Sequence, residues 1–121
     1  MKKLLALFFC ILLGACADNE VSLDCKRAAL VNLGIKKFDE SSNITMNDAA
    51  SCSVAFLFSL DENDILRLFD GGIATVSAYA DEAFALCYTF VQKADSNAMK
   101  NIFEQAQIAI SYAKSHRKCF E

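Results

Sequence analysis

The stretch CSVAFLFSLDENDILRLFDGG, residues 52–72, decides the fold that we expect. Its first part, residues 52–60, is apolar on nearly every side when wound into a helix, which is typical of a helix buried at the centre of a domain. Asp61 then offers a side-chain oxygen that can cap a new helix, and the pair Gly71 and Gly72 ends or kinks that helix. The stretch therefore predicts a central helix, a turn and a second, shorter helix.

Helical spacing continues on the N-terminal side of this stretch. The chain has no Pro and only four Gly, and its apolar residues recur at intervals of three and four, which indicates helices rather than strands. The spacing predicts helices over residues 21–37 and 46–60. Thr45 and Asp48 resemble a capping box at the start of the second of these helices.

Two further helices are predicted after residue 72. One begins at Ile73 and turns an apolar stripe toward the core: Val76, Ala80, Ala83, Cys87 and Phe90. After a polar break at residues 93–97, the last helix carries a second stripe: Met99, Ile102, Ala106, Ala109 and Ala113. The alanines of both stripes either allow the helices to pack closely or leave space for a bound ligand. The expected fold is all-α, a small bundle of four to five helices.

The first 17 residues have the layout of a secretory signal. Two lysines precede an uncharged run at residues 4–13, and small residues follow. Ten apolar residues are too few for a bilayer, which needs roughly 20. We therefore expect a signal peptide over residues 1–17 and a single helical domain over residues 18–121. This domain would be secreted and extracellular, with no transmembrane segment in the mature chain.

The end of this segment allows a second interpretation. The tetrapeptide LGAC, residues 13–16, resembles the lipobox of bacterial lipoproteins. That resemblance implies a membrane-anchored lipoprotein acylated at Cys16. Asn43, followed by Ile44 and Thr45, forms an N-glycosylation sequon in a polar stretch, so Asn43 is a candidate glycan site in a secreted protein.

The charge of the predicted domain excludes one class of partner. Beyond residue 17 the chain carries 10 Lys or Arg (12 less Lys2 and Lys3) and all 15 Asp or Glu, so its net charge is −5. An acidic surface with dispersed cations repels phosphate backbones. We therefore expect no nucleic-acid partner.

Four cysteines remain in the predicted domain: Cys25, Cys52, Cys87 and Cys119. They lie 27, 35 and 32 positions apart. A metal site needs closely spaced pairs, whereas an even number of cysteines in an exported domain predicts disulfides. We expect two bridges, each closing a loop of about 30 residues and stabilising the fold by about 3 kcal/mol. Four cysteines can form two disulfides in three ways, and the sequence does not distinguish among them.

The sequence offers little catalytic chemistry. His116, the single histidine, lies among cations and has no acid beside it. Leu66 stands where a calcium-binding loop of the EF-hand type needs Gly, and no nucleotide-binding, metalloprotease or hydrolase motif occurs. We therefore expect a non-enzymatic protein without cofactor or metal.

Aromatic and aliphatic residues are the remaining candidates for function. They either fill the core or enclose an apolar pocket between helices, where ligands commonly bind. The candidate pocket residues are Phe56, Phe58, Tyr79, Phe84, Phe90, Phe103 and Ile110. The sequence favours a secreted binding protein, such as a carrier of an apolar small molecule, whose partner is that molecule or a protein. The alternative is a secreted effector or toxin-like protein that acts through its surface.

In outline the chain is similar to insect odorant-binding proteins, which are secreted, acidic and helical. Those proteins have closely spaced cysteine pairs, and Cys52 and Cys119 have no such neighbours. The resemblance therefore assigns no functional residue in this chain.

Overall fold

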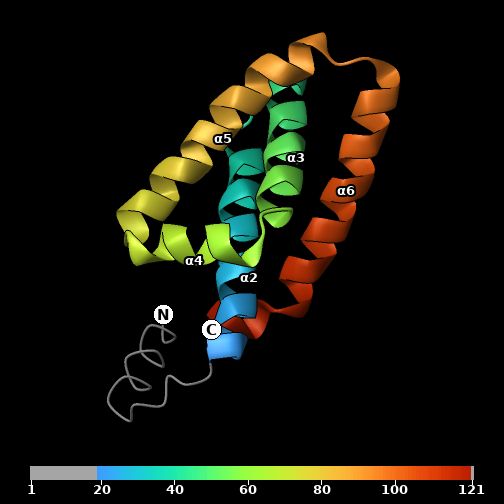
Figure 1. The fold of residues 1–121 in the computed structure, drawn as a ribbon. Helices are drawn as coiled ribbons and strands as arrows, with labels where there is room; N and C mark the ends of the chain where they lie inside the picture. The colour runs from blue at the N-terminus through green and yellow to red at the C-terminus, as the bar shows by residue number, and fades with distance from the viewer. Residues whose placement is uncertain (1–18, 121) are drawn as a thin grey trace.

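The protein is an all-α bundle stapled by two disulfides, as the sequence predicts. The computed structural model describes residues 19–120. The predicted signal peptide at residues 1–17 and the lipidation candidate Cys16 lie outside these residues. The helices are α2 (Asn19–Asp39), α3 (Ile44–Phe58), α4 (Glu62–Asp70), α5 (Ile73–Lys93) and α6 (Ser96–Ser115), followed by a short 3-10 helix, η1 (Arg117–Phe120) (Figure 1).

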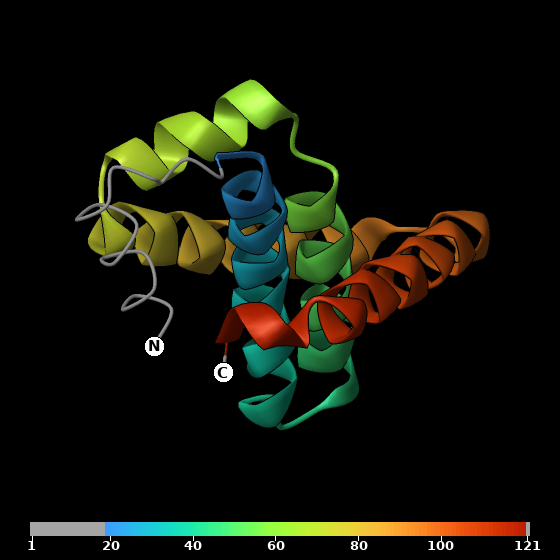
Figure 2. The same cartoon turned by 90° about the horizontal axis from the view of Figure 1, so that it is seen from below.

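Helices α2 and α3 form an antiparallel hairpin at the centre of the molecule. Helices α4 and α5 cover one side of the hairpin, and α6 covers the other (Figures 1 and 2). Helix α3 contacts α2, α5 and α6, so the central helix expected from residues 52–60 is confirmed.

The hairpin divides the core into two clusters. On one side, Leu30 and Leu57 are fully buried in a cluster that α2, α3, α4 and α5 share. On the other side, Val31 and Val54 pack against Ala109 of α6. Since Leu30 and Val31 are consecutive in α2, this helix is buried on a wider arc than a single apolar stripe.

Three helices begin at capping side chains. The carboxylates of Asp61 and Asp95 each accept a hydrogen bond from a backbone N–H in the first turn of α4 and α6, at 2.9 Å. The capping box predicted at Thr45 is wrong. Asn43 caps α3 instead, because its extended backbone lets its side-chain oxygen accept from the Met46 N–H at 2.9 Å. Asn is as good a cap as Thr or better, and the helix therefore starts before Thr45.

The Gly71–Gly72 pair ends α4 and does not kink it. Gly72 has a φ of 92°, a left-handed conformation that favours glycine. Helix α5 starts at the next residue, Ile73, and runs back across the hairpin.

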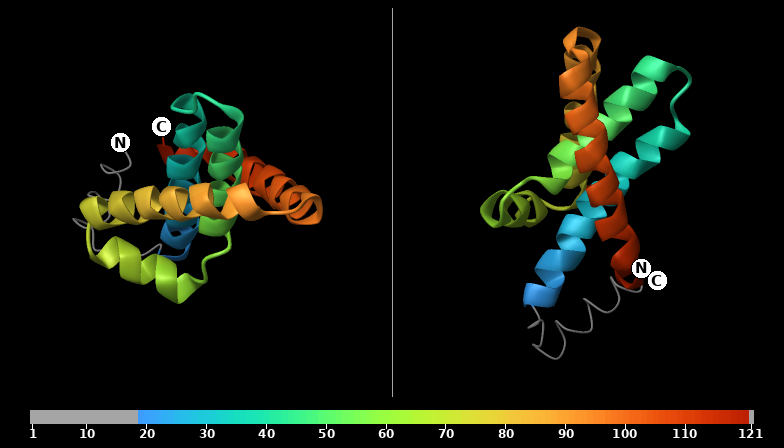
Figure 3. Two further views of the ribbon diagram at one scale, coloured as in Figure 1. Left: turned by 90° about the horizontal axis from the view of Figure 1, so that it is seen from above. Right: turned by 90° about the vertical axis from the view of Figure 1, so that its right-hand side faces the viewer.

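The apolar stripe of α5 is buried along most of its length. Val76, Ala80, Ala83 and Cys87 are buried, as predicted. Phe90 was expected to continue this stripe, but its side chain is 51% exposed. Helix α5 crosses the hairpin obliquely (Figure 3), and the stripe leaves the interface toward the end of the helix.

Small side chains occupy the interfaces that α5 and α6 form with the hairpin. The five alanines of the α5 and α6 stripes are all at most 5% exposed: Ala80, Ala83, Ala106, Ala109 and Ala113. Their small side chains bring the helices close together, and Ala83 also lines a groove at the surface.

The disulfides pair Cys25 with Cys119 and Cys52 with Cys87. Their Cα atoms are 5.5 and 5.7 Å apart, within the usual range for a bridge. One loop spans 35 positions, close to the expectation, but the other spans 94. The expectation of two loops of about 30 residues is therefore wrong for Cys25–Cys119, because α6 runs back beside the start of α2.

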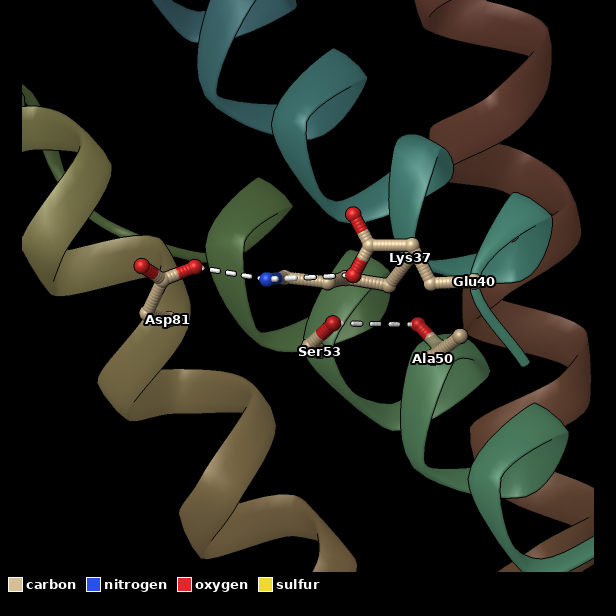
Figure 4. Close-up of polar contacts among 5 residues, drawn as sticks. All are labelled: Lys37, Glu40, Ala50, Ser53 and Asp81. Carbon is tan, nitrogen blue, oxygen red and sulfur yellow. Dashed lines mark hydrogen bonds and ion pairs between the residues drawn. The ribbon is translucent and has the colours of Figure 1, made fainter. Parts of the chain in front are cut away.

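Two cations of α2 tie the helices together. The guanidinium of Arg27 donates to the carbonyls of Phe58, at 2.8 Å, and of Leu60, at 2.5 Å, where α3 ends. The ammonium of Lys37 lies 2.6 Å from Asp81 of α5 and 3.8 Å from Glu40 (Figure 4). In the same region, the buried hydroxyl of Ser53 donates to a carbonyl in its own helix.

Candidate functional site

An apolar groove lies between α3 and α5, beside the Cys52–Cys87 disulfide. Phe56 lines it from α3, and Ala83, Leu86 and Phe90 line it from α5, together with the two half-cystines. Its volume is about 210 Å³. The bridge fixes the two walls of the groove relative to each other, so the groove is preformed.

Large apolar side chains are exposed in this groove. Phe56 is 42% exposed, Leu86 66% and Phe90 51%. Single exposed apolar residues are ordinary on a protein surface, whereas a gathered set in a hollow is a candidate binding site. These three side chains and the disulfide make the groove the leading candidate site.

The helical repeat explains why these residues meet. Cys52 and Phe56 are four residues apart on α3, and Leu86 and Phe90 are four residues apart on α5, so each pair lies on one face of its helix. The disulfide at Cys87 brings the two faces together.

A second groove, of about 280 Å³, lies between α4 and α5. Leu68, Thr75 and Tyr79 line it, and the ion pair of Asp64 and Arg67 completes the lining, with 3.1 Å between the two groups. Its composition is more polar than that of the first groove.

The two grooves meet at a pair of stacked rings. Phe56 of the first groove and Tyr79 of the second have ring centroids 6.3 Å apart. Burial raises the pKa of the Tyr79 hydroxyl, and the negative charges of Asp64 and Glu82 raise it further. Tyr79 therefore lies in negative potential and stays neutral well above neutral pH.

The seven candidate pocket residues do not gather in one place. Phe56 and Phe90 line the first groove, and Tyr79 lines the second. Phe58 and Ile110 pack against the core cluster that α6 shares. Phe84 lies beneath the ammonium of Lys37, which is 5.5 Å from its ring centroid. Phe103 is 43% exposed on α6.

Sequence reasoning missed Leu86 and the role of the Cys52–Cys87 bridge in the groove. Leu86 lies outside the buried stripe of α5, and its position in the sequence could have indicated that it is exposed. A large apolar residue outside the core stripe, four positions from another one, predicts an exposed apolar patch.

The glycan candidate Asn43 is exposed at the turn between α2 and α3. Its capping bond uses the side-chain oxygen, and a glycan would be attached to the side-chain nitrogen. The prediction of glycosylation at Asn43 stays a prediction.

The polar cluster at the end of α6 has a structural role. The His116 Nδ1 lies 2.8 Å from the Tyr112 carbonyl, and the Ser115 hydroxyl donates to the same carbonyl at 2.9 Å. Tyr112 in turn reaches Asp24 of α2 at 3.3 Å, and burial together with the Asp24 charge raises the pKa of Tyr112. These contacts join the last turn of α6 to the start of α2.

The part of the chain that the structure describes, residues 19–120, contains no helix that combines the length and the hydropathy needed to cross a membrane. Over the same residues, no three His, Cys, Asp or Glu side chains gather in a way that could hold a metal ion.

The chain was compared with protein families, curated proteins and solved structures. No protein-family model, no curated protein and no solved structure matches this chain. The fold and the groove define its class, a disulfide-bonded all-α domain with an exposed apolar groove.

Proposed function

We propose that the protein is an exported, non-enzymatic binding module that receives an apolar group of its ligand in the α3–α5 groove. The observation that carries this proposal is the gathering of three exposed apolar side chains, Phe56, Leu86 and Phe90, beside a disulfide. Covering such side chains on binding is favourable, by about 25 cal/mol for each Å² removed from water.

The form of the groove favours recognition at the surface over an enclosed carrier pocket. Its volume of about 210 Å³ lies below the roughly 300–1,000 Å³ of sites that bury a whole drug-sized ligand. The groove suits one large side chain or one short alkyl or aromatic group. The ligand would therefore present an apolar group while its remainder stays outside.

Export is supported by the two disulfides, which persist in oxidising compartments, and by the signal-like layout of residues 1–17. The alternative is a lipoprotein anchored through Cys16. The intact mass of the protein from its natural source separates the two: a chain starting at Asp18 supports secretion, and a diacylglycerol adduct on Cys16 supports anchoring.

A neutral apolar dye, N-phenylnaphthylamine, tests the groove directly. The protein has no Trp, so the fluorescence of the dye can be followed without overlap. We expect the dye to bind, and Phe90→Ser to weaken binding by about tenfold or more, because burying a Phe side chain contributes roughly 1.5–3 kcal/mol. The matched control is Phe103→Ser, since Phe103 is similarly exposed but does not line the groove.

Two results would overturn the proposal. One is the absence of dye binding to the folded, oxidised protein. The other is an equal loss of affinity in Phe90→Ser and Phe103→Ser, which would place the dye on general apolar surface. Circular dichroism of both variants verifies that the helices are retained.

A further inference from the structure

One face of α5 carries a stripe that joins the two grooves. Thr75, Tyr79, Glu82, Leu86 and Phe90 follow one another at intervals of four, three, four and four residues, so they lie on the same face of the helix. Four of them line a groove, and Glu82 stands between Tyr79 and Leu86. The stripe thus places a carboxylate in the middle of an otherwise apolar and aromatic surface.

Glu82 has no ion-pair partner among residues 19–120, and its side chain is exposed. The neighbouring carboxylate, Asp81, points toward α2, where Lys37 pairs with it at 2.6 Å (Figure 4). The charge of Glu82 is therefore available to a partner.

The sequence segment that forms α4 and most of α5 is acidic. Residues 61–92 hold six Asp or Glu and one Arg, a net charge of −5. The other residues of 18–121 hold nine acids and nine Lys or Arg, which cancel. Most of the excess negative charge thus lies on the segment that forms α4 and α5, since Lys93 at the end of α5 offsets only one acid. A cationic partner is complementary to this charge.

The spacing of the two hollows favours a helix as the partner. Along α5, Leu86 of the first groove lies seven residues from Tyr79 and eleven from Thr75 of the second, which is about 10.5 and 16.5 Å at the helical rise. The stacked pair of Phe56 and Tyr79 separates the two grooves. A partner helix that lies along α5 presents large side chains on one face at spacings of seven and eleven residues, two and three turns apart, which matches these distances. A peptide that binds as an added strand needs main-chain partners, and the backbone groups within α3 and α5 are already bonded inside their helices.

We propose that this stripe, with its two flanking grooves, is the docking surface for a basic amphipathic helix of a protein partner. This inference rests on the proposed function, because it uses the same α3–α5 groove and names the ligand class. Apolar side chains of the partner enter the two grooves, and a Lys or Arg between them pairs with Glu82. A second copy of the chain fits less well, because a symmetric contact centred on the stripe would bring Glu82 close to Glu82.

The test uses two synthetic helical peptides with the same leucine pattern, one carrying lysines and the other glutamates on the polar face. Binding to the oxidised protein is measured by fluorescence anisotropy of labelled peptide. We expect the lysine peptide to bind at least about tenfold more tightly than the glutamate peptide, and its affinity to fall as salt is raised.

Variants locate the contact. Leu86→Ser should weaken the lysine peptide by about tenfold. Glu82→Gln should weaken it about two- to fivefold, as expected for one exposed ion pair. Glu104→Gln is the matched control, because Glu104 is an exposed carboxylate on α6, away from both grooves.

Equal binding of both peptides, or equal effects of Glu82→Gln and Glu104→Gln, would overturn the inference. So would a concentration-dependent dimer that Leu86→Ser abolishes, since the surface would then belong to a second copy. If the neutral dye still binds in any of these cases, the proposed function stands without the basic helix. If neither dye nor peptide binds, both fail.

Discussion

Gly34 shows at the scale of one residue how the hairpin is built. A Cβ atom added at Gly34 of α2 would meet Val54 Cγ2 at 3.0 Å and the Val54 Cα at 3.2 Å. Backbone atoms cannot move aside as the end of a side chain can. The missing side chain thus sets the close approach of α2 and α3, on which both core clusters depend.

We therefore expect Gly34→Ala to lower the free energy of unfolding by about 1–3 kcal/mol, the usual effect of overpacking. In an uncrowded helix the same change would raise stability by up to about 1 kcal/mol, because Ala is the better helix former. Urea unfolding followed by circular dichroism decides the sign. A more stable variant would contradict the close contact.

Exposure of single aromatic rings was the least predictable property at this scale. The stripe of α5 predicted that Phe90 would be buried beside Cys87, and the apolar run at residues 52–60, which includes Phe56, predicted a helix buried on nearly every side. Both side chains are about half exposed. Helical spacing fixes which face a residue occupies, but the crossing of two helices decides where along that face the contact ends.

At the scale of the element, α3 depends on groups outside it. Its N-terminus is capped by Asn43, and its C-terminal carbonyls receive the guanidinium of Arg27 from α2. The first contact is local and could have been found in the sequence, since Asn43 immediately precedes the helix. The second joins residues more than 30 positions apart and had no sequence signal.

Removing the hydrogen bonds that Arg27 donates to the end of α3 should destabilise the protein. We expect Arg27→Met, which keeps much of the apolar stem, to lower the free energy of unfolding by about 2 kcal/mol, because hydrogen bonds to charged groups contribute roughly 1.5–3 kcal/mol each and this group is partly solvated. Arg67→Met is the control, since Arg67 is exposed and pairs only within its own helix. Similar midpoints for the two variants would contradict a role of Arg27 in ending α3.

At the scale of the whole molecule, the two disulfides hold different parts of the fold together. Cys25–Cys119 joins the start of α2 to the end of the chain, while Cys52–Cys87 joins the walls of the apolar groove. The second loop lies inside the first. Their effects on the unfolded chain are therefore not additive.

Each bridge can be removed as a pair of Ser substitutions. Loops of this size contribute about 4–5 kcal/mol by restricting the unfolded chain, so the melting temperature should fall in both double variants. Cys25→Ser with Cys119→Ser should also open Arg117 and Lys118 to trypsin while dye binding persists. Cys52→Ser with Cys87→Ser should weaken the dye. An unchanged melting temperature in either variant would contradict the assigned bridge.

The sequence by itself determined the helices, the number of cysteines in the domain and its acidic charge, because these depend on local spacing and composition. Residues 52–72 correctly predicted the central helix and the cap at Asp61, and they left open whether Gly71 and Gly72 end or kink α4. The tertiary structure decided the disulfide pairing, the exposure of Phe56 and Phe90, and the meeting of the two grooves at Tyr79. These features depend on the angles at which helices cross, and such angles arise from contacts between residues far apart in the chain.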